Sequence, residues 1–201
     1  MHGSRRHDDT RYAVVALIAG GLLWGLTWMP IKHFGGHGLT GFTLTLATYG
    51  VVGVLTLPLF LAQRARWQQQ WPALLLVAVF GGLANLCFVV ALMDGPVMRV
   101  MLLFYLAPIW GVIGGRLFFG ERLTAPRLLA VGMAVIGAIL VLGGPETLLG
   151  AALTWLDFVA IAAGLLYAGQ NIAARAADQI PLLSKSLSVF IGCGIVGAIG
   201  I

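Results

Sequence analysis

Few residues of this chain could do chemistry, because charged side chains make up only 9% of its 201 residues. Ionisable groups inside apolar segments mark function more often than other positions do. Asp157 lies about one helical turn inside an apolar stretch, where its carboxylate could exchange protons or could be solvated at headgroup level. Arg99 could pair with nearby Asp94, or it could attract an anionic group of a substrate. Asp157 and Arg99 are therefore the first candidates for a working charge.

Uncharged polar side chains in apolar segments seek partners on other helices or line a cavity. Asn85, Gln170 and Asn171 hold such positions, and substrate binding and helix–helix hydrogen bonding explain them equally well. Pro108 lacks an N–H, so the carbonyl of Phe104 loses its helical partner; that carbonyl could meet a substrate, or the proline could mark a packing kink. The aromatic residues that could line a cavity, or could be ordinary packing residues and interface anchors, are Trp24, Trp28, Tyr49, Tyr105, Trp110 and Tyr167.

Neither a metal centre nor a catalytic motif is indicated by the sequence. His33 and His37 are four residues apart, a spacing that suits a metal only on a helix, and the intervening Gly35-Gly36 favours a solvated loop instead. Cys87 and Cys193 lie in apolar stretches without ligand-like neighbours. No HExxH or GxSxG motif occurs. We therefore expect neither an enzyme nor a bound cofactor or metal.

The elements that must position these residues are long apolar segments. Hydrophobic residues make up 60% of the chain and the mean hydropathy is +0.97, whereas a soluble domain carries about a quarter charged residues. About 20 apolar residues cross a bilayer as a helix, and strands of a barrel would show an alternation that is absent. The sequence predicts an all-α polytopic bundle of about seven transmembrane helices at 12–31, 40–62, 72–93, 97–119, 125–142, 153–174 and 182–201.

The twelve Lys and Arg residues are distributed unevenly between the two sets of alternate loops. Lys32 and Arg99 fall in one set, and the other ten, in clusters around residues 5–11, 64–66, 116–127 and 175–185, fall in the other. Cytoplasmic loops carry the Lys/Arg excess, so the N-terminus is expected to be cytoplasmic. The net charge of +5 forms no stripe or patch, which argues against a nucleic-acid partner.

Small residues and a faint internal repeat describe how the helices could pack. Glycine and alanine recur at four-residue spacing, which lets helix backbones approach closely. Residues 21–32, GLLWGLTWMPIK, also resemble residues 164–175, GLLYAGQNIAAR. Five predicted spans separate the two stretches, so they would cross the bilayer in opposite senses, as in transporters with inverted repeats. The small-residue motifs are Gly21-xxx-Gly25, Gly111-xxx-Gly115 and Ala160-xxx-Gly164-xxx-Ala168.

One stretch resembles a known family. Residues 91–119, ALMDGPVMRVMLLFYLAPIWGVIGGRLFF, lead into Gly120-Glu121-Arg122-Leu123-Thr124 and a Gly-rich segment at 129–137. This closely resembles the EamA domain of the drug/metabolite transporter superfamily, in which a Pro-containing fourth helix ends in a GE-[RK]-L turn. Residues 21–32 are similar to the family's opening helix. We expect Glu121 to be structural, pairing with Arg122, Arg127 or the N–H groups at the start of the fifth helix.

The resemblance implies ten helices in two inverted five-helix repeats, and export of small metabolites or drugs by alternating access. On that pattern residues 1–11 are a cytoplasmic tail, 12–143 the first repeat, and 151–201 the first two helices of a second, incomplete repeat. The expected setting is a bacterial inner membrane, with the lipid bilayer and a small-molecule substrate as partners. A truncated fragment, or a half-transporter that needs a homodimer partner or a missing half, is the alternative. An intramembrane enzyme or seven-helix receptor is less favoured.

Overall fold

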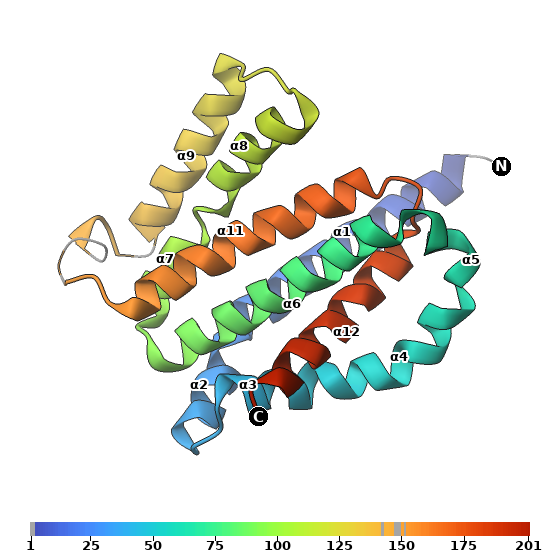
Figure 1. The fold of residues 1–201 in the computed structure, drawn as a ribbon. Coiled ribbons are helices and arrows are strands. Elements are labelled where there is room, and N and C mark those ends of the chain that lie inside the picture. Colours follow the sequence, from blue (N-terminus) through green and yellow to red (C-terminus); the bar gives the residue numbers. More distant parts are fainter. Residues whose placement is uncertain (1–2, 142, 147–149, 151) are drawn as a thin grey trace.

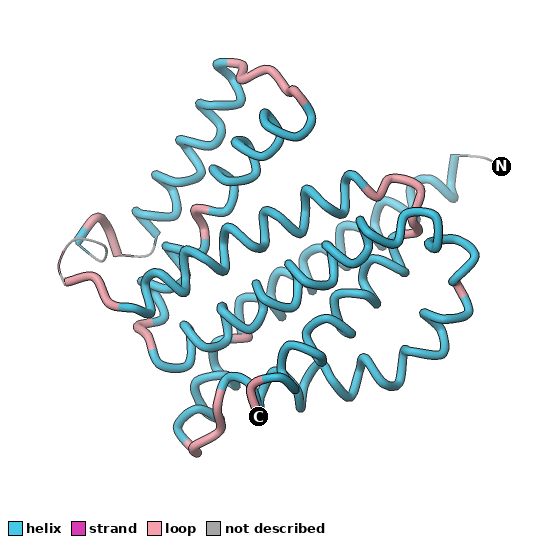
Figure 2. Tube along the Cα trace, in the orientation of Figure 1, coloured by secondary structure: helices cyan, strands magenta, loops and turns pink. Residues whose placement is uncertain are grey.

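The computed structural model describes residues 3–141, 143–146, 150 and 152–201, and in these residues the chain forms helices joined by short loops (Figures 1 and 2). The expectation of an all-α bundle is confirmed. In chain order the described helices are α1 (Gly3–Leu26), α2 (Trp28–Gly36), α3 (Gly41–Thr45), the π-helix η1 (Leu46–Gly50), α4 (Val51–Ala62), α5 (Arg64–Trp67), the 3₁₀ turn η2 (Gln68–Gln70), α6 (Trp71–Asp94), α7 (Val97–Phe104), α8 (Ala107–Phe119), α9 (Ala125–Val141), α11 (Trp155–Ala176) and α12 (Leu182–Ile199).

Six stretches of the described chain are long and apolar enough to cross a bilayer. Two of them are interrupted. The first, Val14–Gly36, breaks at Thr27 between α1 and α2, and the fourth, Val97–Phe119, breaks at residues 105–106 between α7 and α8. The predicted fifth span is shorter than the others: its apolar helix is Ala125–Leu140. A helix of that length rises only about 25 Å, so it needs a thinner bilayer or flanking residues that reach the interface.

The helix α6 is the centre of the bundle, and α11 and α12 pack along it (Figure 1). Small residues make these crossings close. A Cβ added at Gly192 of α12 would lie 2.1 Å from the carbonyl oxygen of Ala78, and one at Gly82 would lie 2.7 Å from the backbone of Gly192. On α11, Ala160 and Ala163 are fully buried. Without a hydrophobic driving force in lipid, such backbone approach supplies the packing energy.

The small-residue motifs predicted from the sequence have different outcomes. Gly164 of the α11 motif lies against α7, where an added Cβ would be 2.8 Å from the Phe104 carbonyl oxygen. The Gly21-xxx-Gly25 prediction is wrong for the described residues, because none of their atoms lies within 4 Å of a Cβ added at either glycine, and the same holds for Gly111. The spacing alone could not distinguish a packed face from an open one.

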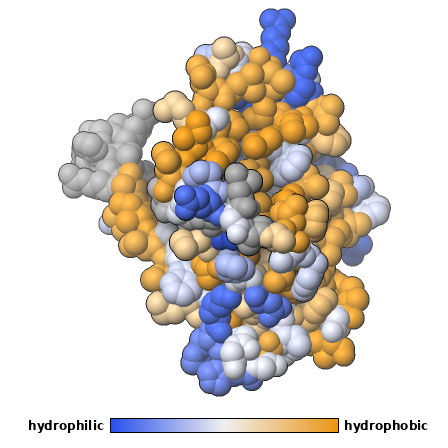
Figure 3. All heavy atoms as spheres, turned by 90° about the vertical axis from the view of Figure 1, so that its left-hand side faces the viewer, coloured by the Kyte–Doolittle hydropathy of each residue, from blue (hydrophilic) through white to orange (hydrophobic). Residues whose placement is uncertain are grey.

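Long-range hydrogen bonds show which loops share an end of the bundle. Gln63 meets Ser184 and Gln70 meets Asp178, so the loops around residues 63–70 and 176–184 lie together. At the opposite end the Lys32 ammonium donates to the carbonyl oxygens of Met93 and Gly95, at 3.0 and 2.7 Å. Between the ends, apolar side chains cover much of the surface, with hydrophilic groups gathered in patches (Figure 3).

Candidate functional site

A cavity of about 330 Å³ lies where the broken helix α7–α8 meets α1 and α11. We call it the aromatic cavity. Three of its walls are the rings of Trp24, Tyr105 and Tyr167, each about 41% exposed in the isolated chain. None of its lining residues in the described chain carries a charge. The complete lining is Trp24, Phe104, Tyr105, Ala107, Pro108, Tyr167, Ala168 and Asn171.

The break that opens this cavity follows from Pro108. Pro108 has no N–H, so no helical bond can reach the carbonyl of Phe104. The chain makes a turn at residues 105–106 instead, and α8 begins at Ala107 with the proline in its first turn, a position that tolerates it. The freed carbonyl oxygen of Phe104 lies next to Gly164, within 2.8 Å of where a Cβ would be. The break therefore packs closely on α11 while its side chains line the cavity.

A row of aromatic rings runs from α1 across α6 to α11. Trp24 stacks on Phe88, with centroids 5.6 Å apart and planes at 18°. Phe88 contacts Phe104 at 4.8 Å, and Phe104 contacts Tyr167 at 5.5 Å. Pairs at these distances gain energy beyond the burial of their surface. The row fixes the positions of the cavity's walls relative to one another.

The structure brings together five of the residues proposed for substrate binding from the sequence: Trp24, Tyr105, Pro108, Tyr167 and Asn171 all line the aromatic cavity. Asn171 donates from Nδ2 to the Tyr167 carbonyl oxygen at 3.0 Å, which leaves its side-chain oxygen free to accept.

The other proposed binding residues lie elsewhere. Asn85 on α6 donates from Nδ2 to the hydroxyl oxygen of Tyr49 at 2.9 Å, a bond between helices. Gln170 is half-buried, with its Oε1 beside Gly81 in the crossing of α6 and α11. Trp28 lies in α2 with 37% of its surface exposed. Arg99 takes part in an ion pair at one end of the bundle. For Asn85 and Gln170, helix contact is the role that their neighbours support.

Arg99 and Asp157 form a buried ion pair between α7 and α11. Arg99 Nε lies 2.8 Å from Asp157 Oδ1, and the two side chains are only 7% and 4% exposed. The second carboxylate oxygen accepts the backbone N–H and the hydroxyl of Thr154, at 2.7 and 3.1 Å. Arg99 Nη2 also donates to the carbonyl oxygen of Ala152 at 3.3 Å. We call Arg99, Asp157 and Thr154 the Arg99 cluster.

Two sequence-based expectations are corrected by this cluster. Arg99 is paired with Asp157, not with the Asp94 that lies near it in sequence. Solvation of Asp157 at headgroup level is wrong as well, because the residue is 97% buried within the protein. As the third residue of α11, Asp157 bonds Thr154 ahead of the helix, and its charge favours the positive N-terminal end of the helix dipole.

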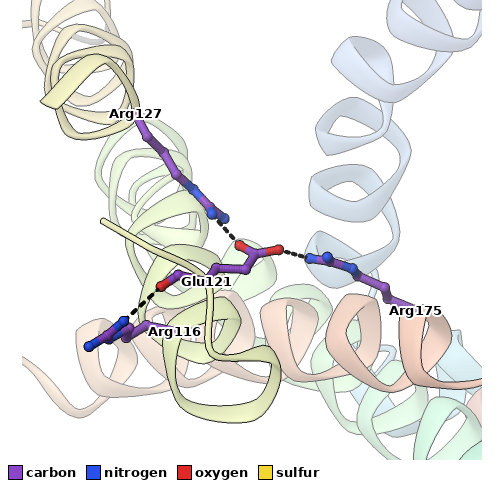
Figure 4. A network of polar contacts seen from close by, with 4 residues as sticks. All are labelled: Arg116, Glu121, Arg127 and Arg175. Atoms are coloured by element: carbon purple, nitrogen blue, oxygen red, sulfur yellow. Dashed lines mark hydrogen bonds and ion pairs between the residues drawn. The ribbon is translucent and has the colours of Figure 1, made fainter. Parts of the chain in front are cut away.

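Glu121 connects three helices at the other end of the bundle (Figure 4). Its carboxylate pairs with Arg127 at the start of α9 and with Arg175 near the end of α11, and its backbone oxygen accepts from Arg116 at 3.3 Å. Hydrogen bonds from Arg127 and then Arg175 hold the pKa of the Glu121 carboxyl below its ordinary value. The expected pairing of Glu121 with Arg127 is confirmed. We call Glu121, Arg127 and Arg175 the Glu121 cluster.

Several residues of the site were missed by reasoning from sequence. Arg175 pairs with Glu121 across 54 residues, and its guanidinium carbon lies 4.4 Å from the centroid of the Phe119 ring. Phe88 and Phe104 hold the aromatic row together. Phenylalanine in an apolar segment gives no signal of its own, whereas the lone acid in the turn after α8 and the basic end of α11 could have suggested the Glu121–Arg175 pair.

The predicted loop around His33 and His37 is wrong. Residues 28–36 are helical, because Gly35 and Gly36 continue α2 rather than ending it, and His37 caps the helix. Gly35 fits there because it lies against Met93, whose Cγ would be 3.0 Å from an added Cβ. The two imidazole rings are 4.5 Å apart, and His37 Nδ1 lies 2.8 Å from the His33 carbonyl oxygen. Among the described residues no group of three or more His, Cys, Asp or Glu side chains forms a metal-site geometry.

A larger hollow of about 620 Å³ lies between η1, α4 and α12. Its lining consists of aliphatic side chains and glycines such as Leu46, Gly50, Val54 and Ile195. Among the described residues its lining has no polar side chain that could orient a solute, and ligand sites need a few such groups. The aromatic cavity, with its hydroxyls and amide, is the better candidate.

The comparison with known families adds to this geometry. The model of the EamA-like transporter family matches residues 11–143. The chain belongs to this family. A transporter of Archaeoglobus fulgidus, described as uncharacterized, is 31% identical over 132 residues, which are 66% of this chain and 46% of that protein. The chain thus spans about half the length of the relative it matches. No solved structure matches it significantly.

Membership of the EamA-like family makes the chain a multi-pass membrane protein. The site combines residues inside the matched stretch with residues that follow it. Trp24, Tyr105, Pro108, Arg99 and Glu121 lie within it. The α11 residues that complete the cavity and the two charged clusters lie beyond it: Asp157, Tyr167, Asn171 and Arg175. Each cluster therefore joins the family-matched helices to α11.

Proposed function

We propose that this protein moves small organic solutes across a membrane by alternating access, and that the aromatic cavity holds the solute. The observation that carries the proposal is the position of the cavity along α11. Tyr167 comes ten residues after Asp157 and eight before Arg175, which is about 15 and 12 Å along the helix. Transporter sites lie near the bilayer midplane beside broken helices, and this cavity adjoins one.

The two charged clusters act in this proposal as closures on either side of the solute. Asp157 and Arg175 are 18 residues apart, so the clusters are separated by about 27 Å, close to the thickness of a hydrocarbon core. Both hold α11 against the segment from α7 to α9. Because Asp157 is already bound by Arg99 and by Thr154, its surroundings support a closing role over the proton-carrying role that the sequence suggested.

The uncharged lining favours neutral or zwitterionic solutes, or amphiphilic ones held by aromatic rings, over strongly charged ones. Transport rather than catalysis is what the family implies. We further propose a bacterial inner membrane with the Glu121 end cytoplasmic, since the basic loops around residues 64–66, 116–127 and 175–185 belong to that end. Following the family pattern, the complete transporter contains a second, inverted repeat, supplied by more chain or by a second copy.

The test compares the solute content of cells and medium, by mass spectrometry, between cells that express the protein and cells with an empty vector. Expressing cells should export at least one small organic solute. Trp24→Ala and Tyr105→Ala, which remove walls of the cavity, should abolish the difference. Trp155→Ala, an exposed aromatic outside the cavity, is the matched control and should preserve it. Identical profiles for vector and wild type would overturn the proposal.

A further inference from the structure

A second cavity, of about 240 Å³, lies beside the break between α1 and α2. We call it the hydroxyl cavity, because four of its lining residues are Thr27, Thr45, Thr48 and Tyr49. Thr27 follows Trp24 by one helical turn, and Val89, another lining residue, follows Phe88. Trp24 lines the aromatic cavity and Thr27 lines this one, so the two cavities adjoin successive turns of the first span. The remaining lining residues are Pro30, Ile31, Phe34 and Leu44.

Two of the hydroxyl groups in this cavity already donate hydrogen bonds within the protein. The Thr27 hydroxyl donates to the carbonyl oxygen of Trp24, and the Thr48 hydroxyl donates to that of Leu44 at 2.8 Å. Each hydroxyl has one proton and two lone pairs, so what these two still offer is lone pairs. The Tyr49 hydroxyl oxygen accepts a hydrogen bond from Asn85 Nδ2. The unused capacity of the lining is thus mainly acceptor capacity.

Two buried oxygens at this place have no hydrogen-bond partner among the described residues: Thr45 Oγ1, on a side chain 1% exposed, and Asn85 Oδ1. A buried polar group without a partner destabilises the fold, so such groups are kept where a ligand or water satisfies them. Thr45 lines the cavity, and Asn85 is hydrogen-bonded to Tyr49, which also lines it.

The backbone around the hydroxyl cavity is irregular on both sides. The helix of the first span is interrupted at Thr27, and Pro30 has no N–H to offer the carbonyl of Leu26. Opposite, residues 46–50 form the π-helix η1, a conformation frequent at functional sites. In transporters, unwound backbone of this kind supplies oxygens that coordinate a coupling cation.

We propose that the hydroxyl cavity binds a sodium ion, held by hydroxyl, amide and backbone oxygens. The lining that the described residues form holds no carboxylate, which disfavours divalent calcium, whereas neutral oxygens suit a monovalent ion. The assignment of this ion as the one that drives transport rests on the proposed function. Its binding does not, and it is measured without a solute.

The experiment is thermal unfolding of the purified protein in detergent, at equal ionic strength in sodium, potassium and choline chloride. A bound ion stabilises the folded state, so the melting temperature should rise by about 2–4 °C in sodium relative to choline. Thr45→Val, which keeps the side-chain shape and removes the unpaired oxygen, should melt in choline at the wild-type temperature or above it, and should lose the sodium shift. Tyr49→Phe, a second variant, should reduce the shift as well.

Thr56→Val is the matched control, because its hydroxyl bonds Val52 within α4, away from the cavity. It should keep the full sodium shift. The proposal is overturned if the wild type melts at one temperature in all three salts, if potassium stabilises as much as sodium, or if the Thr45→Val and Tyr49→Phe variants both keep the shift. If the wild type shows the sodium shift but expressing cells export no more solute than vector cells do, the transport proposal fails and the sodium site stands.

Discussion

At each end of this bundle an ion-pair cluster joins the helices, and the two clusters differ in burial. In the Arg99 cluster the Arg99 and Asp157 side chains are almost fully buried, and hydrogen bonds with the exposed residues Thr154 and Ala152 reinforce their ion pair. The Glu121 cluster is open: 57% of the Arg175 side chain and 36% of the Arg127 side chain are exposed. Removing one member of a buried ion pair strongly destabilises the fold. An exposed ion pair contributes little to stability, and salt screens it.

The difference suggests which end opens more readily. Breaking the Arg99 cluster leaves a charge in a protein interior, but breaking the Glu121 cluster exposes its charges to water. The resting structure should therefore open preferentially at the Glu121 end, and the Arg99 end should need a compensating event, such as the binding of a solute or an ion.

The largest effect is expected from Asp157→Asn. The change leaves Arg99 buried without its counter-charge, so the free energy of unfolding should fall by about 3–5 kcal/mol. SDS-induced unfolding in mixed micelles measures it. Asp178→Asn, at an exposed carboxylate that accepts one bond from Gln70, is the control and should change little. Equal losses in the two variants would remove the contrast between buried and exposed ends.

A smaller loss is expected from Arg99→Lys. Lysine keeps the charge but lacks the fork that reaches both Asp157 and Ala152, so about 1–2 kcal/mol should be lost in the same assay. Arg116→Lys, at the open end, should be close to neutral. If Arg99→Lys is neutral too, the charge alone matters and the geometry of the buried cluster does not.

The smallest effect concerns pH at the Glu121 cluster. Because the folded-state pKa of Glu121 is lowered by its arginine partners, the cluster stabilises the fold above the ordinary carboxyl value of about 4.3, and this contribution is lost as pH falls below it. The melting-temperature difference between wild type and Glu121→Gln should be present at neutral pH, shrink on acidification and shrink in high salt. A difference that grows as pH falls would mean that the sign is wrong.

Much of this architecture could be predicted from the sequence, because apolar segment length dictates helices in a bilayer. The break at Pro108 and the role of Glu121 also follow from local chemistry. The pairing of Arg99 with Asp157 could not be predicted, since it depends on how α7 packs along α11 across 58 residues of chain. The helix through Gly35 and Gly36 was missed for a similar reason: a tertiary contact with Met93 overrides the low helix propensity of glycine.

The central claim is that the aromatic cavity lies between two closures that can open separately. Its most direct test is labelling of Asn171→Cys, in a Cys87→Ala and Cys193→Ala background, with a membrane-impermeant maleimide applied to intact cells and to inverted vesicles. Glu121→Gln should raise labelling several-fold from the Glu121 side alone, and Asp157→Asn from the Arg99 side alone. A buried control, Ser188→Cys, should stay unlabelled throughout. Labelling that rises equally from both sides in each variant, or changes in neither, would contradict the account.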